Sequence, residues 1–189
     1  IMKTIVITFG RFQGIHRGPE MLANFMRTKA EEVDGTYMMF PTYTHDKKNP
    51  IPFETKVKHL KALLPSHSEH ISTNHPTSIV GILKMLSSVY ERGIFVCGAD
   101  RIVGGEKWLH NYNGLEYHFE QLDIIAAGNP RSEHSEYAVE GCSGTNMRLY
   151  VTVDNYYNFA LCSPTEAPED IIPEVYNELR QVMLTTICS

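Results

Sequence analysis

The sequence predicts an α/β fold with a doubly wound parallel sheet in a single domain. Short apolar runs alternate along the chain with longer stretches of helical periodicity, and this order is typical of a parallel sheet covered by helices on both faces. A glycine-rich turn, TFGRFQGIHRGPE, joins the first apolar run to the first helical stretch. Such a turn at the carboxyl end of a strand is where a Rossmann-like sheet holds its ligand. Right-handed crossovers are expected between the strands.

Each element follows from a local pattern. The five expected strands are short apolar runs bounded by polar or turn residues, at positions 3–8, 36–41, 70–73, 93–97 and 122–127. The longer expected helices have amphipathic spacing, at positions 20–33, 53–64, 77–92 and 169–184. Ser143 opens a further short helix, and the polar stretch 129–141 suits a loop. The last helix is expected to pack on the sheet or on a partner subunit of a homo-oligomer.

Length and charge narrow the class of protein. The 189 residues, 42% of them hydrophobic, suffice for the core of one domain. We place this domain at residues 2–189, with a core over 2–150 and a helical extension over 151–189. A formal charge of -5 without a block of Lys and Arg argues against an extended nucleic-acid surface and favours a small anionic ligand.

Cysteine spacing and hydropathy bear on location. The cysteines are widely spaced and contain no C-x-x-C, at Cys97, Cys142, Cys162 and Cys188. No apolar run reaches the length that spans a membrane. We therefore expect a cytoplasmic protein without a membrane partner.

The glycine-rich turn carries residues suited to phosphate. Gly10 and Gly18 allow a ligand to approach the backbone closely, Arg11 adds a fixed charge, and His16 can donate to a phosphate oxygen. The free N–H groups at the start of the following helix also favour an anion. We therefore expect phosphate at this turn.

A second motif, CSGTNMR, lies near the end of the predicted core. Ser143 or Thr145 can cap a helix whose first amides point at a phosphate, and Arg148 supplies a forked, charged donor. Taken alone, Ser-Gly-Thr before a helix is more often an ordinary cap. The motif gains meaning because it follows the first one in the same chain.

Two segments between these motifs carry further candidates. In FVCGADR, Gly98, Asp100 and Arg101 follow a strand, where the carboxylate can accept from a ribose hydroxyl or a base, or can cap the next helix. Lys47 and Lys48 follow the second strand and can hold the phosphate of an acceptor. Exposed lysine pairs are more often only solvated.

The two motifs together resemble a known family. GRFQGIHRG is similar to the G-x-F-x-x-x-H-x-G-H signature of the nucleotidylyltransferase superfamily. CSGTNMR resembles its I-S-S-T-x-x-R signature, with Ser143, Gly144, Thr145 and Arg148 in the fixed positions. The segments KKNPIPFETKVKHLKALLP, GADR and NYNGLEY look closest to the small, cytidylyltransferase-like nucleotidyltransferases of bacteriophages. Pro19 stands where the family carries its second histidine.

The resemblance implies a transferase that joins a nucleoside triphosphate to a small phosphorylated acceptor and releases pyrophosphate. It implies catalytic roles for His16, Arg148 and Lys47. It implies nucleotide binding by Gly10, Arg11, Phe12, Gly18, Gly98, Asp100, Arg101, Ser143, Gly144 and Thr145. Mg²⁺ is expected as a cofactor held mainly by the substrate phosphates, so no residue is nominated as a metal ligand.

Two alternatives stay open beside this interpretation. The GRFQ opening is shared with NMN adenylyltransferases, and Pro19 also fits a catalytically degenerate nucleotide-binding protein. Loss of one oxyanion donor costs about 3–4 kcal/mol, whereas whole enzymatic accelerations draw on about 8–23 kcal/mol. A slow enzyme is therefore compatible with Pro19.

Other histidines do not indicate a site of another kind. The histidines at positions 67, 70 and 75 lack the spacing of a zinc site. His45 and Asp46 have no nearby nucleophile with which to form a catalytic triad.

Overall fold

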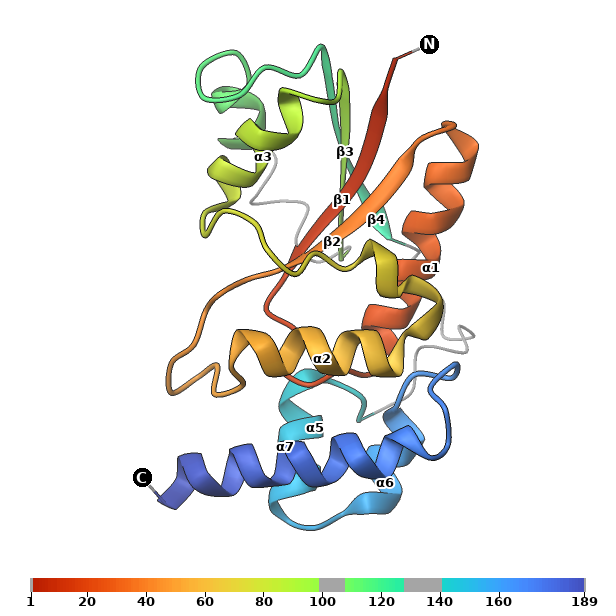
Figure 1. The fold of residues 1–189 in the computed structure, drawn as a ribbon, viewed down its shortest axis with the longest axis vertical. Coiled ribbons are helices and arrows are strands. Elements are labelled where there is room, and N and C mark those ends of the chain that lie inside the picture. Colours follow the sequence, from red (N-terminus) through yellow and green to blue (C-terminus); the bar gives the residue numbers. More distant parts are fainter. Residues whose placement is uncertain (1, 99–107, 128–140, 189) are drawn as a thin grey trace. The chain divides into compact units, whose positions relative to one another are not determined.

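The structure is a computed structural model that describes residues 2–98, 108–127 and 141–188. This part of the chain is α/β, with a four-stranded parallel sheet in the order β2-β1-β3-β4 (Figure 1). The strands are β1 (Thr4–Gly10), β2 (Thr36–Pro41), β3 (Arg92–Gly98) and β4 (Gln121–Ala127). The register is set by pairs such as Ile5 with Gly93 and Ile94 with Asp123.

Three of the described helices, α3, α5 and α6, begin at capping residues that the sequence supplies. Ser78, Ser143 and Asn155 accept backbone N–H groups at the starts of their helices, as N-caps do. The α-helices that the structure describes in full are α1 (Arg17–Glu32), α2 (Phe53–Leu63), α3 (Ile79–Ser87), α5 (Gly144–Thr152), α6 (Tyr156–Cys162) and α7 (Ile171–Cys188). A 3-10 helix, η1 (Pro65–His70), lies between α2 and α3 in the chain.

The predicted third strand, at positions 70–73, is wrong. η1 runs into this stretch, and no strand of the described sheet covers it. A strand inside a parallel sheet is covered on both faces and needs a nearly continuous apolar run. Here only Ile71 is apolar and buried, and Pro65 favours a helical turn just before it. The sheet therefore has four strands in the described part of the chain, where five were expected.

Other predicted elements exist with shifted ends. The helix expected over 77–92 stops at Ser87, because the N–H groups of Val89 and Tyr90 bond back to Leu86 before the chain enters β3. The predicted loop over 129–141 lies outside the described residues except for Gly141. Helix α6 was not predicted, since its sequence is short and rich in aromatic residues, which are weak helix formers.

The described residues form two compact units, each made from three stretches of chain. The sheet unit holds the described residues of the stretches 2–9, 22–40 and 74–127, and the helical unit holds those of 10–21, 41–73 and 141–188. In the sheet unit, α1 and α3 lie on opposite sides of the sheet (Figure 1). The core beside α3 is a single apolar cluster that includes Ile5, Ile7, Phe40, Ile82, Leu83 and Leu86.

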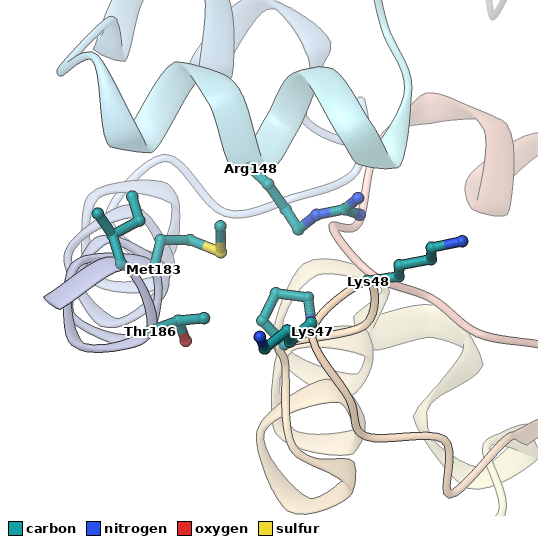
Figure 2. A pocket seen from close by; sticks show the side chains of 7 residues that line it. Lys47, Lys48, Arg148, Met183 and Thr186 are labelled. Carbon is teal, nitrogen blue, oxygen red and sulfur yellow. The ribbon is translucent and has the colours of Figure 1, made fainter. Parts of the chain in front are cut away.

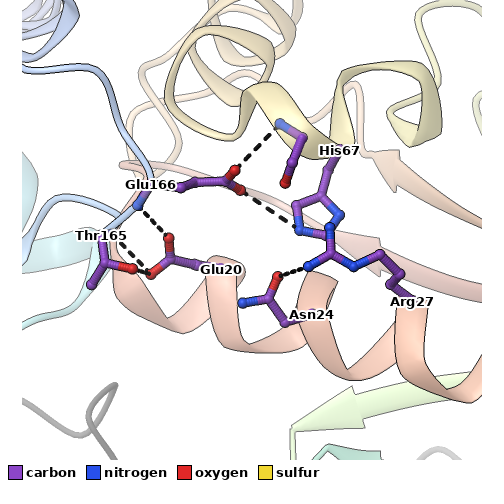
Figure 3. Close-up of polar contacts among 7 residues, drawn as sticks. Glu20, Asn24, Arg27, His67, Thr165 and Glu166 are labelled. Atoms are coloured by element: carbon purple, nitrogen blue, oxygen red, sulfur yellow. Dashed lines mark hydrogen bonds and ion pairs between the residues drawn. The ribbon is translucent and has the colours of Figure 1, made fainter.

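A buried carboxylate organises part of the helical unit. Glu20, in the first turn of α1, is 1% exposed. Its carboxylate accepts hydrogen bonds from the N–H and hydroxyl of Thr165 and from the N–H of Glu166, each at 2.9 Å (Figure 3). Glu166 in turn accepts from the N–H of Ser66 and lies 3.7 Å from Nε2 of buried His67. The start of α1 is thus joined to η1 and to the segment before α7.

Helix α7 is held to two other helices of the helical unit. Glu178 pairs with Lys58 and with Nε2 of His59 at 2.8 Å, which ties α7 to α2. Arg180 donates to the carbonyl of Val151 at 2.6 Å, which ties α7 to α5. Burial lowers the pKa of His59 even though Glu178 opposes the shift. The middle of α7 is therefore fixed, and its last turns extend beyond these contacts.

Two of the four cysteines, which are widely spaced in the sequence, form a disulfide. A disulfide joins Cys142, just before the cap of α5, to Cys162, the last residue of α6. Cys97 and Cys188 are free thiols. Within the described ranges, no helix is both long and apolar enough to cross a membrane.

Replacing Glu20 with Gln tests the buried carboxylate. In the wild-type protein, both carboxylate oxygens of Glu20 accept hydrogen bonds, whereas the amide of Gln places a donor at one of these two positions. We therefore expect Glu20→Gln to lower the free energy of unfolding by about 2–3 kcal/mol. Glu31→Gln, an exposed change on the same helix, should stay within about 0.5 kcal/mol. Urea denaturation measures both, and equal effects of the two changes would contradict the role assigned to Glu20.

Candidate functional site

The candidate site starts in the turn between β1 and α1. Gly10 leaves room for the Phe12 ring, because a Cβ at this position would lie 2.6 Å from that ring, which would have to shift. Phe12 itself has a left-handed backbone, with a φ of 47°, which costs a non-glycine residue about 1–2 kcal/mol. Strained residues of this kind cluster at ligand sites. The turn therefore maintains a conformation that its own residues do not favour locally.

His16 is set as a neutral hydrogen-bond donor. Its Nδ1 accepts the N–H of Gly18 at 3.1 Å, which leaves the ring proton on Nε2. Burial lowers the pKa of His16 to about 4, so the ring is uncharged at pH 7. A Cβ at residue 18 would lie 2.5 Å from Cε1 of His16, so any other residue there would displace the imidazole ring. The Gly18 N–H therefore forms a hydrogen bond within the turn, whereas the sequence suggested that it faces a phosphate.

The two sequence motifs are in direct contact within the helical unit. A Cβ on Gly14 would lie 2.8 Å from the carbonyl oxygen of Gly144, and a Cβ on Gly144 would lie 2.9 Å from that of Gln13. Gly14 also has a φ of 111°, which favours glycine. Only two glycines allow this approach. The start of α5 therefore packs against the turn that holds His16.

Arg148 reinforces the same contact. Its guanidinium donates to the carbonyl oxygen of Gln13 at 2.5 Å, across 135 positions of sequence. Burial lowers the pKa of Arg148, but an arginine stays charged in proteins. Ser143 caps α5 by accepting the N–H of Asn146 at 3.0 Å, whereas Thr145 is exposed. Between the two cap candidates of the sequence, the structure selects Ser143.

Gln13 is a functional candidate that the sequence analysis missed. Its side chain is buried and pairs twice with the backbone of Ile51, donating at 3.1 Å and accepting at 2.8 Å. Its own carbonyl accepts from Arg148. Gln13 occupies a variable position of the motif, so the motif itself does not identify it. The only signal in the sequence was an amide side chain within a turn that is buried. Gln13 joins the turn, α5 and the loop that carries Lys47.

A compact turn supports the lysine loop. Asp46 accepts from the N–H of Lys48 and from the backbone and side-chain N–H groups of Asn49, each at 2.9 Å. The hydrogen bond from the Asn49 side chain is the main reason that the pKa of Asp46 is lowered. Lys47 and Lys48 are exposed. The loop backbone is therefore ordered while both ammonium groups stay accessible.

Lys47, Lys48 and Arg148 line one pocket of about 590 Å³ in the helical unit (Figure 2). The remaining lining residues are Pro50, Met183, Thr186 and Ile187. Three of these belong to α7, which the sequence analysis left without a role in the site. A pocket of this volume is within the usual range for small ligands.

Lys56 is a second residue that the sequence analysis missed. It is fully buried, its ammonium donates to the carbonyl of Thr42, and the N–H of Thr42 donates to the carbonyl of Gly10 at 2.8 Å. Burial lowers the pKa of Lys56 to about 8. The signal was present in the sequence, because Lys56 shares the apolar face of α2 with Leu60 and Leu63. Lys56 thus links the segments that follow β1 and β2.

The remaining predicted residues divide into three groups. Arg11 is exposed in the turn, and Gly98 ends β3 in the sheet unit. Asp100 and Arg101 lie outside the described residues. Pro19 is the third residue of α1. It fits there because the N–H groups of the whole first turn lack partners inside the helix.

Metal-binding side chains do not gather in the described ranges. No group of three or more His, Cys, Asp and Glu residues could hold a metal ion there. No protein-family model matches this chain, and no curated protein matches it. Its function therefore has to be inferred from the residues and geometry of the site.

Stability in mild acid tests the neutral state of His16. Its folded pKa of about 4 lies below the ordinary 6.5, so the stability that it contributes is complete above pH 6.5 and is lost as the pH falls toward 4. Between pH 7 and pH 5 we expect the wild-type protein to lose on the order of 1–2 kcal/mol more than His16→Asn, which keeps an acceptor for Gly18. Urea midpoints at both pH values measure this difference. Equal losses would show that His16 is not held neutral.

Proposed function

We propose that the protein is a nucleotidyltransferase with a Rossmann-like fold, which transfers a nucleoside monophosphate to a small phosphorylated acceptor. One observation carries the proposal: the residues of both signature-like motifs meet around the Gln13 carbonyl, where Arg148 donates and Gly144 packs. His16 lies in the same turn, with its Nε2 proton available to an oxygen. Motifs far apart in sequence thus contribute to a single anion-binding arrangement.

The strand order adds support. The chain passes from β1 to β2 on one side, and β3 pairs with β1 on the other. Ligands of open α/β sheets bind where the strand order reverses in this way, beyond the carboxyl ends of the strands. The turn with His16 follows the end of β1, and Gly98 ends β3.

The reaction requires positioning and charge more than a reactive side chain. A phosphate oxygen of the acceptor attacks the α-phosphorus, the bond to the bridging oxygen breaks, and pyrophosphate leaves with the electron pair. His16 donates from Nε2 to the developing charge, while Arg148 and the start of α5 hold the outer phosphates. Lys47 and Lys48 offset the charge of the acceptor. The triphosphate oxygens would hold magnesium, which would offset part of their negative charge.

The nucleoside is assigned to residues of two segments by the family resemblance alone. Gly10 and Phe12 would contact it from the turn, where the Phe12 ring packs over Gly10. Gly98, with Asp100 and Arg101 after it, would contact the ribose or base.

Two alternatives have specific support. The GRFQ opening favours an NMN adenylyltransferase. Pro19 favours a nucleotide-binding protein without turnover, because proline provides neither a side-chain donor nor an N–H in the first turn of α1. Arg17 and Arg11, which precede Pro19 in the chain, are cations that could replace the missing histidine.

Pyrophosphate release tests the proposed reaction. ATP, CTP, GTP and UTP are each combined with magnesium and with NMN, phosphopantetheine, glycerol phosphate or a sugar phosphate. We expect release with one pair, abolished or reduced about 10²–10³-fold by His16→Asn, which removes the Nε2 donor. Triphosphate binding by calorimetry without release in any pair would favour the binding-protein alternative.

Pro19→His tests whether this position lacks a catalytic donor. A histidine in the first turn of α1 would add a donor beside His16, so we expect kcat to rise by about 10²–10³. Pro19→Ala is the matched control, because it removes the ring without adding a donor. A rate that is unchanged in Pro19→His, or raised equally in both variants, would contradict the lost-donor hypothesis.

A further inference from the structure

The pocket beside the proposed phosphate site has two chemically different walls. One wall carries Lys47 and Lys48 from the loop that follows β2, together with Arg148 from α5. The other wall carries Met183, Thr186 and Ile187 from the last turns of α7. In Figure 2 the Met183 side chain points from α7 toward the space between Arg148 and Lys47. The pocket therefore offers positive charge and apolar surface to the same ligand.

The charged wall suits a phosphomonoester. Lys47 and Lys48 are exposed on a loop whose backbone Asp46 and Gln13 hold in place. Their ammonium groups can meet phosphate oxygens without a change in the backbone. Arg148 is already engaged with Gln13 through one nitrogen, and its guanidinium has further N–H donors for an anion.

The apolar wall is incompletely covered. α7 is held by Glu178 and Arg180, which lie three to nine residues before the residues that line the pocket. Ile187 is 60% exposed, so a ligand that covers it removes apolar surface from water. A wholly polar acceptor, such as a sugar phosphate, would gain nothing from this surface.

We propose that this pocket selects an amphipathic phosphomonoester as the acceptor, with its phosphate on Lys47 and Lys48 and an apolar arm against Met183 and Ile187. The role of this ligand as an acceptor rests on the proposed transferase function. Its binding to the pocket does not require turnover. It gives α7 a role in specificity: the helix discriminates among acceptors that share a phosphate and differ in the attached group.

A series of alkyl phosphates tests the pocket without nucleotide. Methyl, butyl and hexyl phosphate are titrated into the full chain by calorimetry. A fully buried methylene contributes about threefold to fourfold in affinity, and the pocket is partly open, so we expect hexyl phosphate to bind at least about tenfold more tightly than methyl phosphate. Equal dissociation constants for the three probes would overturn the proposal.

Variants separate the two walls. Met183→Gln combined with Ile187→Thr keeps the approximate side-chain size but removes apolar surface. This double change should abolish the preference for hexyl phosphate and leave the dissociation constant of methyl phosphate unchanged. Lys47→Gln combined with Lys48→Gln should lower the affinity for methyl phosphate and for hexyl phosphate by a similar factor. Leu161→Ser is the matched control, because Leu161 is 44% exposed on α6 and does not line the pocket. A preference for hexyl phosphate that survives the α7 changes would overturn the role of α7.

The outcomes also distinguish this inference from the proposed function. Pyrophosphate release together with equal affinities for the alkyl phosphates would retain the transferase and reject the amphipathic acceptor. A chain-length preference that depends on Met183 and Ile187, without release from any triphosphate, would retain the pocket and reject the transferase.

Discussion

The hydrogen bonds of Gln13 are the interaction on which the candidate site depends. Its side chain pairs with Ile51 and its carbonyl accepts from Arg148, so one buried residue sets the position of three segments. Buried polar groups must be paired, and a glutamine that loses either partner leaves unpaired donors or acceptors in the interior. The spacing between the neutral His16, the cationic Arg148 and the lysine loop is therefore maintained by a residue that itself performs no chemistry.

Buried and exposed polar groups have different tasks in the helical unit. Glu20 and Lys56 are almost completely buried and connect segments of backbone, which makes them structural. Lys47 and Lys48 are exposed on a loop that Asp46 orders. Arg148 combines both tasks, because it binds Gln13 and also lines the pocket. The cations that can bind a ligand are thus positioned by neighbouring residues whose own hydrogen bonds are made within the protein.

Most of the fold follows from local sequence patterns, and the exceptions have physical causes. β1, β2, β3 and β4 were predicted because apolar runs of sufficient length are unambiguous, whereas the stretch 70–73 contained one buried apolar residue and formed no strand. The cap at Ser143 was predicted from residue type and is present. α6 was missed because local propensity there is weak, and its position is fixed by the disulfide and by tertiary packing.

The sequence by itself determined which residues are candidates for binding an anion: His16 in a glycine turn, Ser143 at a helix start, and Arg148 five residues later. Glycine positions, caps and residue types are local properties, and they can be read over a few residues. Only the tertiary structure decided that Gln13 joins the two motifs, that Lys56 is buried, and that α7 supplies a wall of the pocket. These are contacts between segments distant in the chain, and they depend on how whole helices pack, which no local pattern specifies.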